Sequence, residues 1–350
     1  MRPFSNRSFN HSSPCTSSQA STRAPIVFCG KTTLEIARAI PLRHTPKPRQ
    51  PLQLPGQSIA ATLVKAAVEE LRAMHPSLSL SPPYHHFVGR HAKGPTRMTS
   101  PSVATLPLPA HSLHHLGDDV YCATPAFALV TVAARTSDRA FLLELSWELC
   151  GTYRTQRTTP DTSYQTPALA SVDEIRSFVA RNPSVRGSRK IARLLRYVAD
   201  GSASPRETKC ALLFGLPRKN GGYGLGMPRM NHEVIASPEA RAISGRSSFR
   251  CDLCWPAAKL DVEYQSREMH GNELSRLRDS RRANALASMG WTVVAITNDE
   301  LESMSATDVI ASILRKQLGK RKDERLPHAH ERKLALRRAL GLPIERHRGY

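Results

Sequence analysis

The feature that most constrains the fold is a pair of short apolar stretches on either side of a turn. Residues 249–255 and 260–265 are rich in side chains that favour strands, and residues 256–259 between them contain a proline. This pattern predicts a β-hairpin. If the turn is symmetric about the middle of 256–259, Asp252 lies directly opposite Glu263.

Two opposed carboxylates have a chemical consequence. Directly opposed residues of an antiparallel pair have Cβ atoms about 5 Å apart, so Asp252 and Glu263 repel each other unless a cation or a shared proton neutralises them. Mg²⁺ and Mn²⁺ prefer such oxygen ligands. Strand alternation puts Asp261 on the face of Glu263, nearer the turn and toward solvent. The alternative is an ordinary surface hairpin with solvated acids, because the register is assumed.

The segments around the hairpin alternate between helical and strand patterns. Helices are predicted over 204–214, 273–289 and 306–318, and further strands over 230–235 and 291–297. With the hairpin, the order is α-β-β-β-α-β-α. This order predicts an α/β (α+β) fold with a mixed sheet.

Several blocks in this region resemble the DUF559 family, which is similar to very-short-patch repair endonucleases and belongs to the PD-(D/E)xK restriction-endonuclease-like superfamily. The blocks are Asp252-Leu253-Cys254-Trp255-Pro256, Leu260-Asp261-Val262-Glu263-Tyr264-Gln265, His270, Asp279, Arg282, Leu286, Gly290-Trp291-Thr292-Val293-Val294 and, upstream, Ser204-Pro205-Arg206-Glu207-Thr208. They occur in the family's order and span about a third of the chain. The resemblance implies a restriction-endonuclease-like core of order α-β-β-β-α-β and hydrolysis of DNA phosphodiester bonds.

The same resemblance implies a set of site residues. Asp252 and Glu263 would hold Mg²⁺ or Mn²⁺, with Glu207 reaching in directly or through water. His270 would act as a proton donor or phosphate contact, although a loop histidine with a structural hydrogen bond is an equal alternative. Gln265 stands where the superfamily signature has Lys. A Lys orients the attacking water and stabilises charge, whereas a neutral amide does only the first well.

Basic residues are abundant. The chain has 50 Lys and Arg against 29 Asp and Glu, a net charge of +21 and a pI near 10.2. This excess favours polyanions, whether nucleic acid or an anionic membrane surface, and a solvated basic surface is the alternative that charge alone leaves open. Arg278, Arg281 and Arg282 share a broad face of the predicted helix after the hairpin, and we expect them to contact phosphates.

The rest of the chain divides by composition into further units. We expect a disordered basic tail over 1–25, an N-terminal domain over 26–155, a helical connector over 156–200, the nuclease-like domain over 201–318 and a basic tail over 319–350. The last segment carries little apolar material, so we expect it to bind DNA without joining a core. The region before residue 200 is expected to be mainly helical.

A weaker resemblance concerns that helical region. Glu148-Leu149-Cys150-Gly151-Thr152-Tyr153 and Ser171-Val172-Asp173 resemble N-terminal regions of bacterial DUF559 proteins, some of which look like abortive-infection antitoxins. Those proteins carry small winged-helix-like modules that bind DNA. The resemblance implies a similar module here and a bacterial cytoplasm.

Cysteine usage and hydropathy agree with that location. Seven scattered cysteines, an odd number, favour reduced thiols, and the CxxC of Cys251 and Cys254 lacks the second pair that a zinc site needs. No stretch approaches the ~20 apolar residues of a membrane span. Gly30-Lys31-Thr32 lacks the earlier glycine of a phosphate-binding loop, because Pro25 stands there, so no small-molecule cofactor is expected.

Two functions follow from these observations, and neither sets an oligomeric state. The first is a metal-dependent endonuclease. The second is a non-catalytic DNA-binding or antitoxin-like regulatory protein that keeps the nuclease fold. Glu207, Asp252 and Glu263 favour the first, because a binder gains nothing from acids that face phosphate. Gln265 slightly favours the second.

Overall fold

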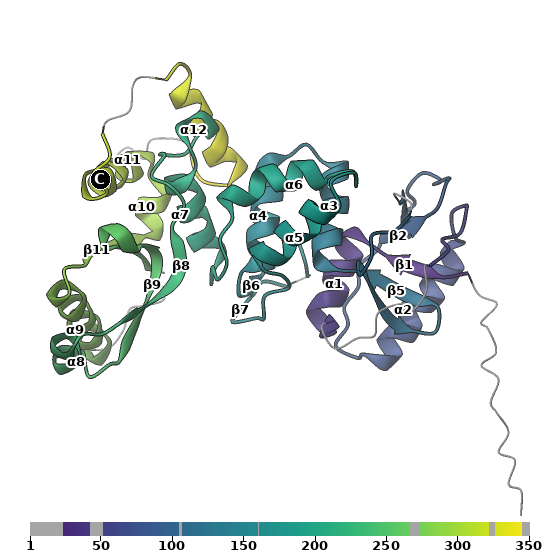
Figure 1. Ribbon diagram of the computed structural model, residues 1–350, viewed down its shortest axis with the longest axis horizontal. Helices are drawn as coiled ribbons and strands as arrows, with labels where there is room; N and C mark the ends of the chain where they lie inside the picture. Colours follow the sequence, from purple (N-terminus) through teal and green to yellow (C-terminus); the bar gives the residue numbers. More distant parts are fainter. Residues whose placement is uncertain are drawn as a thin grey trace, which may run out of the picture.

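The chain has a mixed α/β architecture with three sheets in the part that the structure describes (Figure 1). This computed structural model describes residues 24–42, 52–104, 107–159, 161–265, 273–321 and 326–344, and the side chains of the helix that begins at Glu273 from Leu277 onward. The view in Figure 1 shows an N-terminal sheet, a central group of helices and a C-terminal sheet.

The N-terminal part is built around a five-stranded sheet of order β3-β2-β1-β5-β4. Its elements are β1 (Ile26–Phe28), α1 (Gly30–Ala39), α2 (Ala61–Met74), β2 (Tyr84–Val88), β3 (Thr99–Val103), β4 (Leu113–Gly117) and β5 (Val120–Ala123). The expectation of a mainly helical region is therefore wrong here, and this sheet is larger than the small winged-helix-like module that we expected. Its strands have three to five residues, and β2, β3 and β4 are rich in His, Ser or Pro, so these three carry little β-branched alternation.

The central part is helical, as expected. It contains α3 (Pro125–Arg135), α4 (Arg139–Cys150), α5 (Val172–Arg181), α6 (Ser188–Leu194) and the 3₁₀ turn η2 (Leu195–Tyr197), with a small sheet of β6 (Tyr153–Arg154) and β7 (Ser163–Tyr164). The three longer central helices each begin where a capping side chain accepts a backbone N–H. Thr124 and Asp138 cap α3 and α4, and Ser171 with Glu174 forms a capping box on α5.

The C-terminal part has the expected order with two short helices added. It contains α7 (Pro205–Gly215), the 3₁₀ turn η3 (Arg218–Asn220), β8 (Arg229–Ile235), α8 (Pro238–Ser244), β9 (Ser248–Trp255), the 3₁₀ turn η4 (Pro256–Ala258), β10 (Leu260–Gln265), α9 (Glu273–Ser288), β11 (Thr292–Thr297), α10 (Asn298–Glu302) and α11 (Met304–Gln317). The four strands form a sheet of order β11-β10-β9-β8. β10 pairs parallel with β11 and antiparallel with β9, so the sheet is mixed, as expected.

The hairpin has the expected register over the pairs that its ladder contains. Leu260 pairs with Trp255, and Val262 pairs with Leu253. The turn between the strands closes through η4 and Lys259, which has a φ of 45°. This ladder ends one position before Asp252 and Glu263. Its register, continued by one residue, would place these two residues opposite each other.

The C-terminal segment corrects another expectation. Residues 329–339 form α12 (Ala329–Ala339), whose Leu336 is buried, as are Leu340 and Leu342 beyond it. The Arg337 side chain is fully buried and donates hydrogen bonds to the carbonyls of Leu301 and Glu302. Three leucines and one buried arginine are enough to dock the segment, although its composition is basic.

The described residues form three apolar clusters. The main core runs from Val27 in β1 through α3, α4 and α7 to Leu342, and the N-terminal core lies around α2. The α9 core joins one face of β8 and β9 to α9, and consists of Val234, Ala236, Ala240, Phe249, Cys251, Cys254, Ala285 and Leu286. No helix in the described ranges is long and apolar enough to cross a bilayer.

Candidate metal centre

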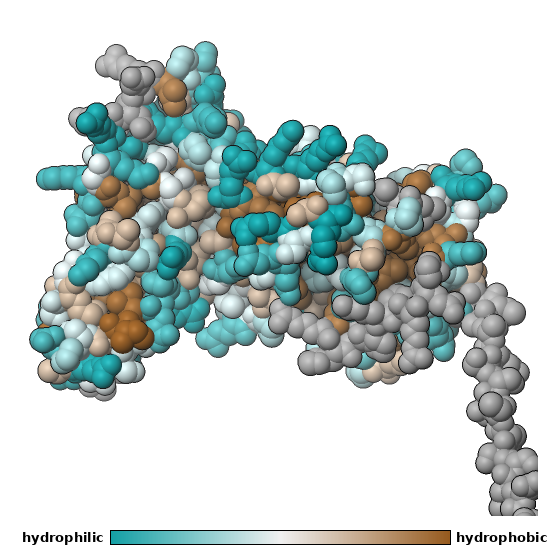
Figure 2. Space-filling view, viewed as in Figure 1, coloured by the Kyte–Doolittle hydropathy of each residue, from teal (hydrophilic) through white to brown (hydrophobic). Residues whose placement is uncertain are grey.

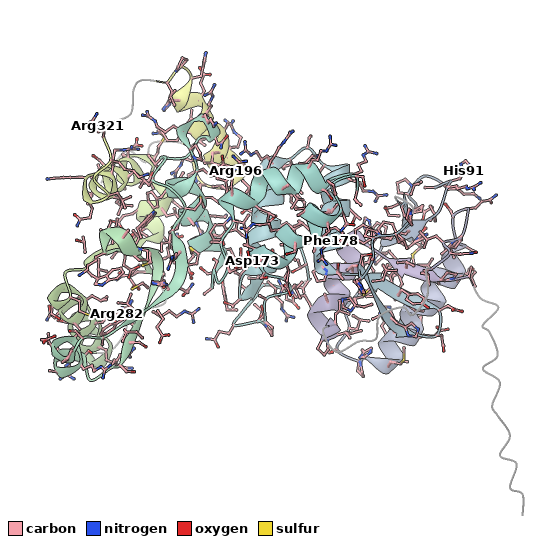
Figure 3. The ribbon with its side chains drawn as sticks, viewed as in Figure 1. His91, Asp173, Phe178, Arg196, Arg282 and Arg321 are labelled. Atoms are coloured by element: carbon pink, nitrogen blue, oxygen red, sulfur yellow. The ribbon has the colours of Figure 1, made fainter. Side chains whose placement is uncertain are left out.

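Four carboxyl groups converge where β9 and β10 meet α7 and α9. Asp252 lies on β9, Asp261 and Glu263 lie on β10, and Glu207 lies in the first turn of α7. The charges of Glu263 and Glu207 both raise the pKa of Asp252, so the three expected metal ligands share one electrostatic environment. Figure 3 labels Arg282, which lies among these groups.

Asp252 lies at the point where the hairpin ladder stops. Its carboxylate accepts the backbone N–H of Tyr264 at 3.0 Å. Burial, and then the charges of Glu263 and Glu207, raise the pKa of Asp252 well above its ordinary value, and the Tyr264 hydrogen bond opposes them. The ionised form of Asp252 is therefore destabilised by burial and by neighbouring negative charge, and a bound cation would stabilise it.

Asp261 is buried, which corrects the expectation that it faces solvent. Its side chain is 0% exposed, and neither carboxylate oxygen has a hydrogen-bond partner among the described residues. Burial raises its pKa to about 7. The reason is that β10 is an inner strand with neighbours on both edges. A fully buried carboxylate whose nearest ion-pair contact is a guanidinium nitrogen at 3.8 Å strongly favours neutralisation by a cation or a proton.

Glu263 is held by an arginine. The guanidinium of Arg282 on α9 contacts the Glu263 carboxylate, lies 3.8 Å from an Asp261 oxygen and donates to the Arg250 carbonyl at 2.7 Å. The guanidinium carbon lies 5.8 Å from the centroid of the Phe249 ring. Burial and the neighbouring Asp261 raise the pKa of Glu263, although Arg282 lowers it.

The three arginines expected to contact DNA therefore differ. Arg278 and Arg281 are exposed on α9, whereas Arg282 turns inward to the carboxylates. Spacing on a helix indicates a shared face within about one turn. Helical spacing alone does not predict that Arg282, and neither Arg278 nor Arg281, forms ion pairs with the acids of β10 in the described ranges.

Glu207 is positioned by its own helix terminus. Ser204 caps α7 and donates its hydroxyl to Glu207, and the Ala203 N–H and the Asn231 amide donate to the other carboxylate oxygen at 3.0 and 2.8 Å. Three donors fix this carboxylate near Asp252. Its oxygens are already satisfied by protein, which suits a contact through water better than a direct metal bond.

The placement of the acids depends on a change of phase in β9. Cys251 and Cys254 both belong to the α9 core, although residues three apart in a regular strand point to opposite faces. Leu253 and Trp255 belong to the main core on the other side. The alternation of side chains therefore slips by one residue at Asp252.

β8 slips at the same point. Met230 packs in the main core and Val234 in the α9 core, although an even spacing should keep them on one face. Between them, Asn231 has a φ of 47°, and the pair of Asn231 with Asp252 is absent from a ladder that is otherwise in register on both sides. In both strands, the alternation of side chains between the two faces of the sheet shifts by one residue at this pair. Asp252 therefore lies at an irregular position of β9, where the regular strand pairing is interrupted.

The donor set fits a divalent cation. Ligand atoms of Cys251, Asp261 and Glu263 all lie within 4.8 Å of one another. A hydrogen bond with Cys254 and burial raise the pKa of the Cys251 thiol, so it is protonated at neutral pH. Carboxylate oxygens are then the available anionic ligands, as Mg²⁺ and Mn²⁺ prefer. Arg282 contacts two of these carboxyl groups, those of Asp261 and Glu263. The raised pKa of each acid on β9 and β10 shows that their negative charges are not fully compensated.

Two other expected site residues lie at the edge of this centre. Gln265 ends β10 on the same strand face as Glu263, and its side chain is exposed. His270 lies outside the described residues. Asp261 was expected to face solvent. The sequence signal for its burial is its position between the apolar Leu260 and Val262, as in a strand that is buried on both faces.

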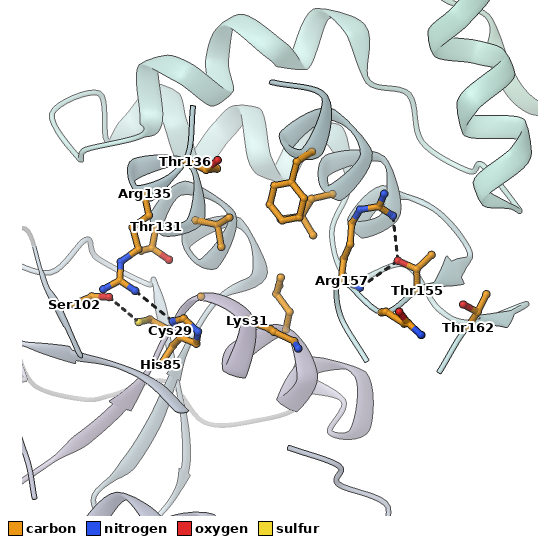
Figure 4. A pocket seen from close by; sticks show the side chains of 16 residues that line it. Cys29, Lys31, His85, Ser102, Thr131, Arg135, Thr136, Thr155, Arg157 and Thr162 are labelled. Atoms are coloured by element: carbon orange, nitrogen blue, oxygen red, sulfur yellow. Dashed lines mark hydrogen bonds between the residues drawn. The ribbon is translucent and has the colours of Figure 1, made fainter. Parts of the chain in front are cut away.

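A cavity elsewhere in the chain is less suited to chemistry. About 700 Å³ is enclosed between α1, α3 and the segment after β6, with Lys31 and His85 on one side and Arg157 on the other (Figure 4). Lys31 lies 3.5 Å from the Glu35 carboxylate, and Arg157 lies 2.5 Å from that of Glu144. These ion pairs neutralise much of the positive charge, so the carboxylate cluster is the stronger candidate.

Comparison with known proteins gives two partial relatives. Both are proteins of Mycobacterium tuberculosis, from strains CDC 1551 / Oshkosh and H37Rv, and both are described as uncharacterized. Each is 31% identical over 129 residues, which cover 37% of this chain and 42% of the relative. The chain thus spans less than half the length of the curated relatives it matches. No protein-family model and no solved structure matches the chain.

Proposed function

We propose that the chain is a metal-dependent endonuclease that hydrolyses DNA phosphodiester bonds. The observation that carries this proposal is Asp261, whose carboxylate is fully buried within 4.8 Å of a Glu263 oxygen and feels the charge of Asp252. Support also comes from the order α7-β8-β9-β10-α9-β11 and its mixed sheet, which suit a restriction-endonuclease-like core.

In the proposed reaction, Asp252, Asp261 and Glu263 would hold Mg²⁺ or Mn²⁺ through carboxylate oxygens. When bound, such a cation would supply Lewis-acid activation of water and charge stabilisation at the phosphate. Glu207, fixed by Ser204 and Asn231, orients a water toward the same point. Gln265, at the open end of β10, orients the attacking water by its amide but adds no positive charge.

Arg282 has a separate role in this proposal. Its guanidinium stabilises Glu263 and Asp261, and so keeps two like charges on one strand face. A phosphate that approached the site would compete for the same guanidinium. Arg282 is therefore placed to exchange part of its contact with the carboxylates for a contact with the substrate.

The second candidate is a non-catalytic DNA-binding or antitoxin-like regulatory protein. The observation that favours it is the pairing of Arg282 with the acids, together with the exposed Gln265 in place of a lysine. In this case Arg282 alone would stabilise the acids, and no cation would be required.

Plasmid nicking separates the two candidates. We expect the full chain to nick supercoiled DNA with Mg²⁺ or Mn²⁺ but not with EDTA, and Asp252→Asn and Asp261→Asn to lose about 100-fold or more of the rate, in line with the loss of transition-state charge stabilisation. Asp173→Asn is the matched control, because this carboxylate is 84% exposed on α5. Nicking that survives in Asp252→Asn and Asp261→Asn, or is absent from the wild type, would refute the nuclease proposal.

A further inference from the structure

A groove on the central helices combines many positively charged side chains with a concave shape. It encloses about 900 Å³ between the end of α3, the start of α4, α6 and η3. Seven cationic side chains line it: Arg139, Arg186, Arg189, Lys190, Arg193, Arg196 and Lys219. No Asp or Glu of the described ranges is among the lining residues. We call this feature the α6 groove.

The arginines of the α6 groove form a stripe. Arg189, Arg193 and Arg196 are spaced by four and three residues along α6 and η2, so they lie on one helical face. Arg186 precedes them just before the helix. The side chains of all four are exposed, and in Figure 3 the labelled Arg196 lies at the edge of the central helices. Figure 2 shows hydrophilic side chains along that edge.

The fold fixes α6 closely against α3. Gly187 precedes α6 with a φ of 101°, and a Cβ at this position would lie 2.2 Å from the Val130 carbonyl oxygen. Ile191 is buried on the face of the helix opposite the arginines, and the buried Leu194 packs at the floor of the groove lining. The stripe is therefore carried by a rigid helix whose other face is committed to the main core.

Two of the seven cations form hydrogen bonds or ring contacts within the protein. Lys190 donates to the carbonyls of Ala133 and Thr136 at the end of α3, at 2.7 and 2.6 Å. Arg139 donates to the Asn220 side chain at 2.9 Å and lies over the ring of Tyr197. The other five, Arg186, Arg189, Arg193, Arg196 and Lys219, form no ion pair with any carboxylate in the described ranges.

We propose that the α6 groove binds the phosphate backbone of duplex DNA. This inference deepens the proposed function, and it rests on it for the identity of the polyanion. Like charges held together on a rigid surface destabilise the free protein, and phosphates would relieve that repulsion while releasing counterions. Arg side chains suit the role, since a guanidinium grips a phosphate with two parallel hydrogen bonds.

The lining of the groove favours DNA over an anionic membrane. A membrane-surface helix inserts large apolar side chains beside its basic face. The large apolar side chains that are exposed in the described ranges, such as Ile235, Ile243, Val309 and Ile313, lie outside the α6 groove. The grooved shape also matches a rod-like polyanion better than a flat bilayer.

The test is binding of the full chain to a fluorescein-labelled duplex of about 25 base pairs, by fluorescence anisotropy in EDTA over a series of salt concentrations. The groove variant replaces Arg189, Arg193 and Arg196 with Gln. Its matched control replaces the exposed Arg90, Lys93 and Arg97 with Gln, which removes the same charge from residues that do not line the groove.

We expect the groove variant to bind about tenfold to hundredfold more weakly at 150 mM salt, and the slope of log K against log salt to fall by about 0.9 for each phosphate that the variant no longer neutralises. The control should bind within about twofold of the wild type on the same electrostatic argument. Circular dichroism melts of the two variants must match the wild type. Equal losses in both variants, an unchanged slope, or arginine-dependent binding to vesicles of phosphatidylserine but not to DNA would overturn the proposal.

The outcome is separable from that of the nuclease proposal because binding in EDTA needs no metal. If the groove variant loses binding while neither the wild type nor any variant nicks DNA, the DNA-binding proposal is supported and the nuclease proposal is refuted. If the wild type nicks DNA and the groove variant binds and nicks DNA as well as the wild type, the DNA-binding proposal is refuted and the nuclease proposal is supported.

Discussion

Asp261 carries the sharpest residue-scale consequence, because its pKa is about 7 in the folded chain against an ordinary value of 3.8. Between these two values the unfolded chain releases a proton that the folded chain retains. Stability therefore falls as pH rises through this window and stays lower above it. Below pH 3.8 both states are protonated and the group has no effect.

Asp261→Asn should remove this pH-dependent loss. In EDTA at pH 8 we expect the variant to melt at or above the wild-type temperature, and at pH 4 to melt at the same temperature. Mn²⁺ should raise the melting temperature of the wild type, more at pH 8 than at pH 6, since protons compete for the carboxylates. It should not raise that of the variant.

Differential scanning fluorimetry at the three pH values checks this prediction, with Asp173→Asn as a control that should behave as the wild type. A variant that melts well below the wild type in EDTA at pH 8, and still responds to Mn²⁺, would show that Asp261 is an ordinary structural acid.

The same residues show what a sequence reveals about such a site. The register of Asp252 and Glu263 was predictable, because turn length and alternating pattern fix a hairpin locally. The burial of Asp261 was not, since it depends on β11 pairing along the other edge of β10. The inward turn of Arg282 depends likewise on where α9 packs.

At the scale of elements, α12 is an integral part of the fold. Arg337→Met should lower the free energy of unfolding by about 3 kcal/mol, because the Leu301 and Glu302 carbonyls and the Thr307 hydroxyl lose a buried charged donor. Arg338→Met, an exposed neighbour on the same helix, should change it by less than about 0.5 kcal/mol. Urea unfolding followed by circular dichroism measures both.

Equal effects of the two substitutions would mean that α12 does not dock in solution. Deletion of 319–350 is consequently a poor test of DNA binding, since it removes buried leucines together with basic charge. Helices were predictable at this scale wherever a cap and a period coincide, as at Ser171 and Ser204. The strands β2, β3 and β4 were not, because their neighbours in the sheet, and not their composition, stabilise them.

At the scale of the whole molecule, the main core crosses the boundaries that composition suggested near residues 155, 200 and 318. Leu143 in α4 and Val262 in β10 belong to one cluster, although we expected them in separate domains. Hydrogen exchange measured by mass spectrometry in rising urea should therefore show α4 and β10 opening at the same urea concentration. Helix α2, in its own N-terminal core, is the comparison that is free to open separately.

Opening of α4 well before β10 would show instead that the central helices and the C-terminal sheet are independent units. Composition does not predict that these two parts share a core, because the core depends on α4 packing against α7 and α12, which lie far from α4 in the sequence. Charge is distributed differently. It was predictable in total, but its concentration in the α6 groove depends on how α3, α4, α6 and η3 meet.

The paired change of phase at Asn231 and Asp252 has a consequence for engineering. A designer who copied the acids of β9 and β10 onto a regular hairpin would reproduce their spacing and still fail. Without the left-handed residue on the neighbouring strand, Asp252 would stay in the pleat and Cys254 would turn to the opposite layer. The portable unit is a three-stranded segment that contains a deliberate irregularity, and transplanting the site means transplanting that irregularity first.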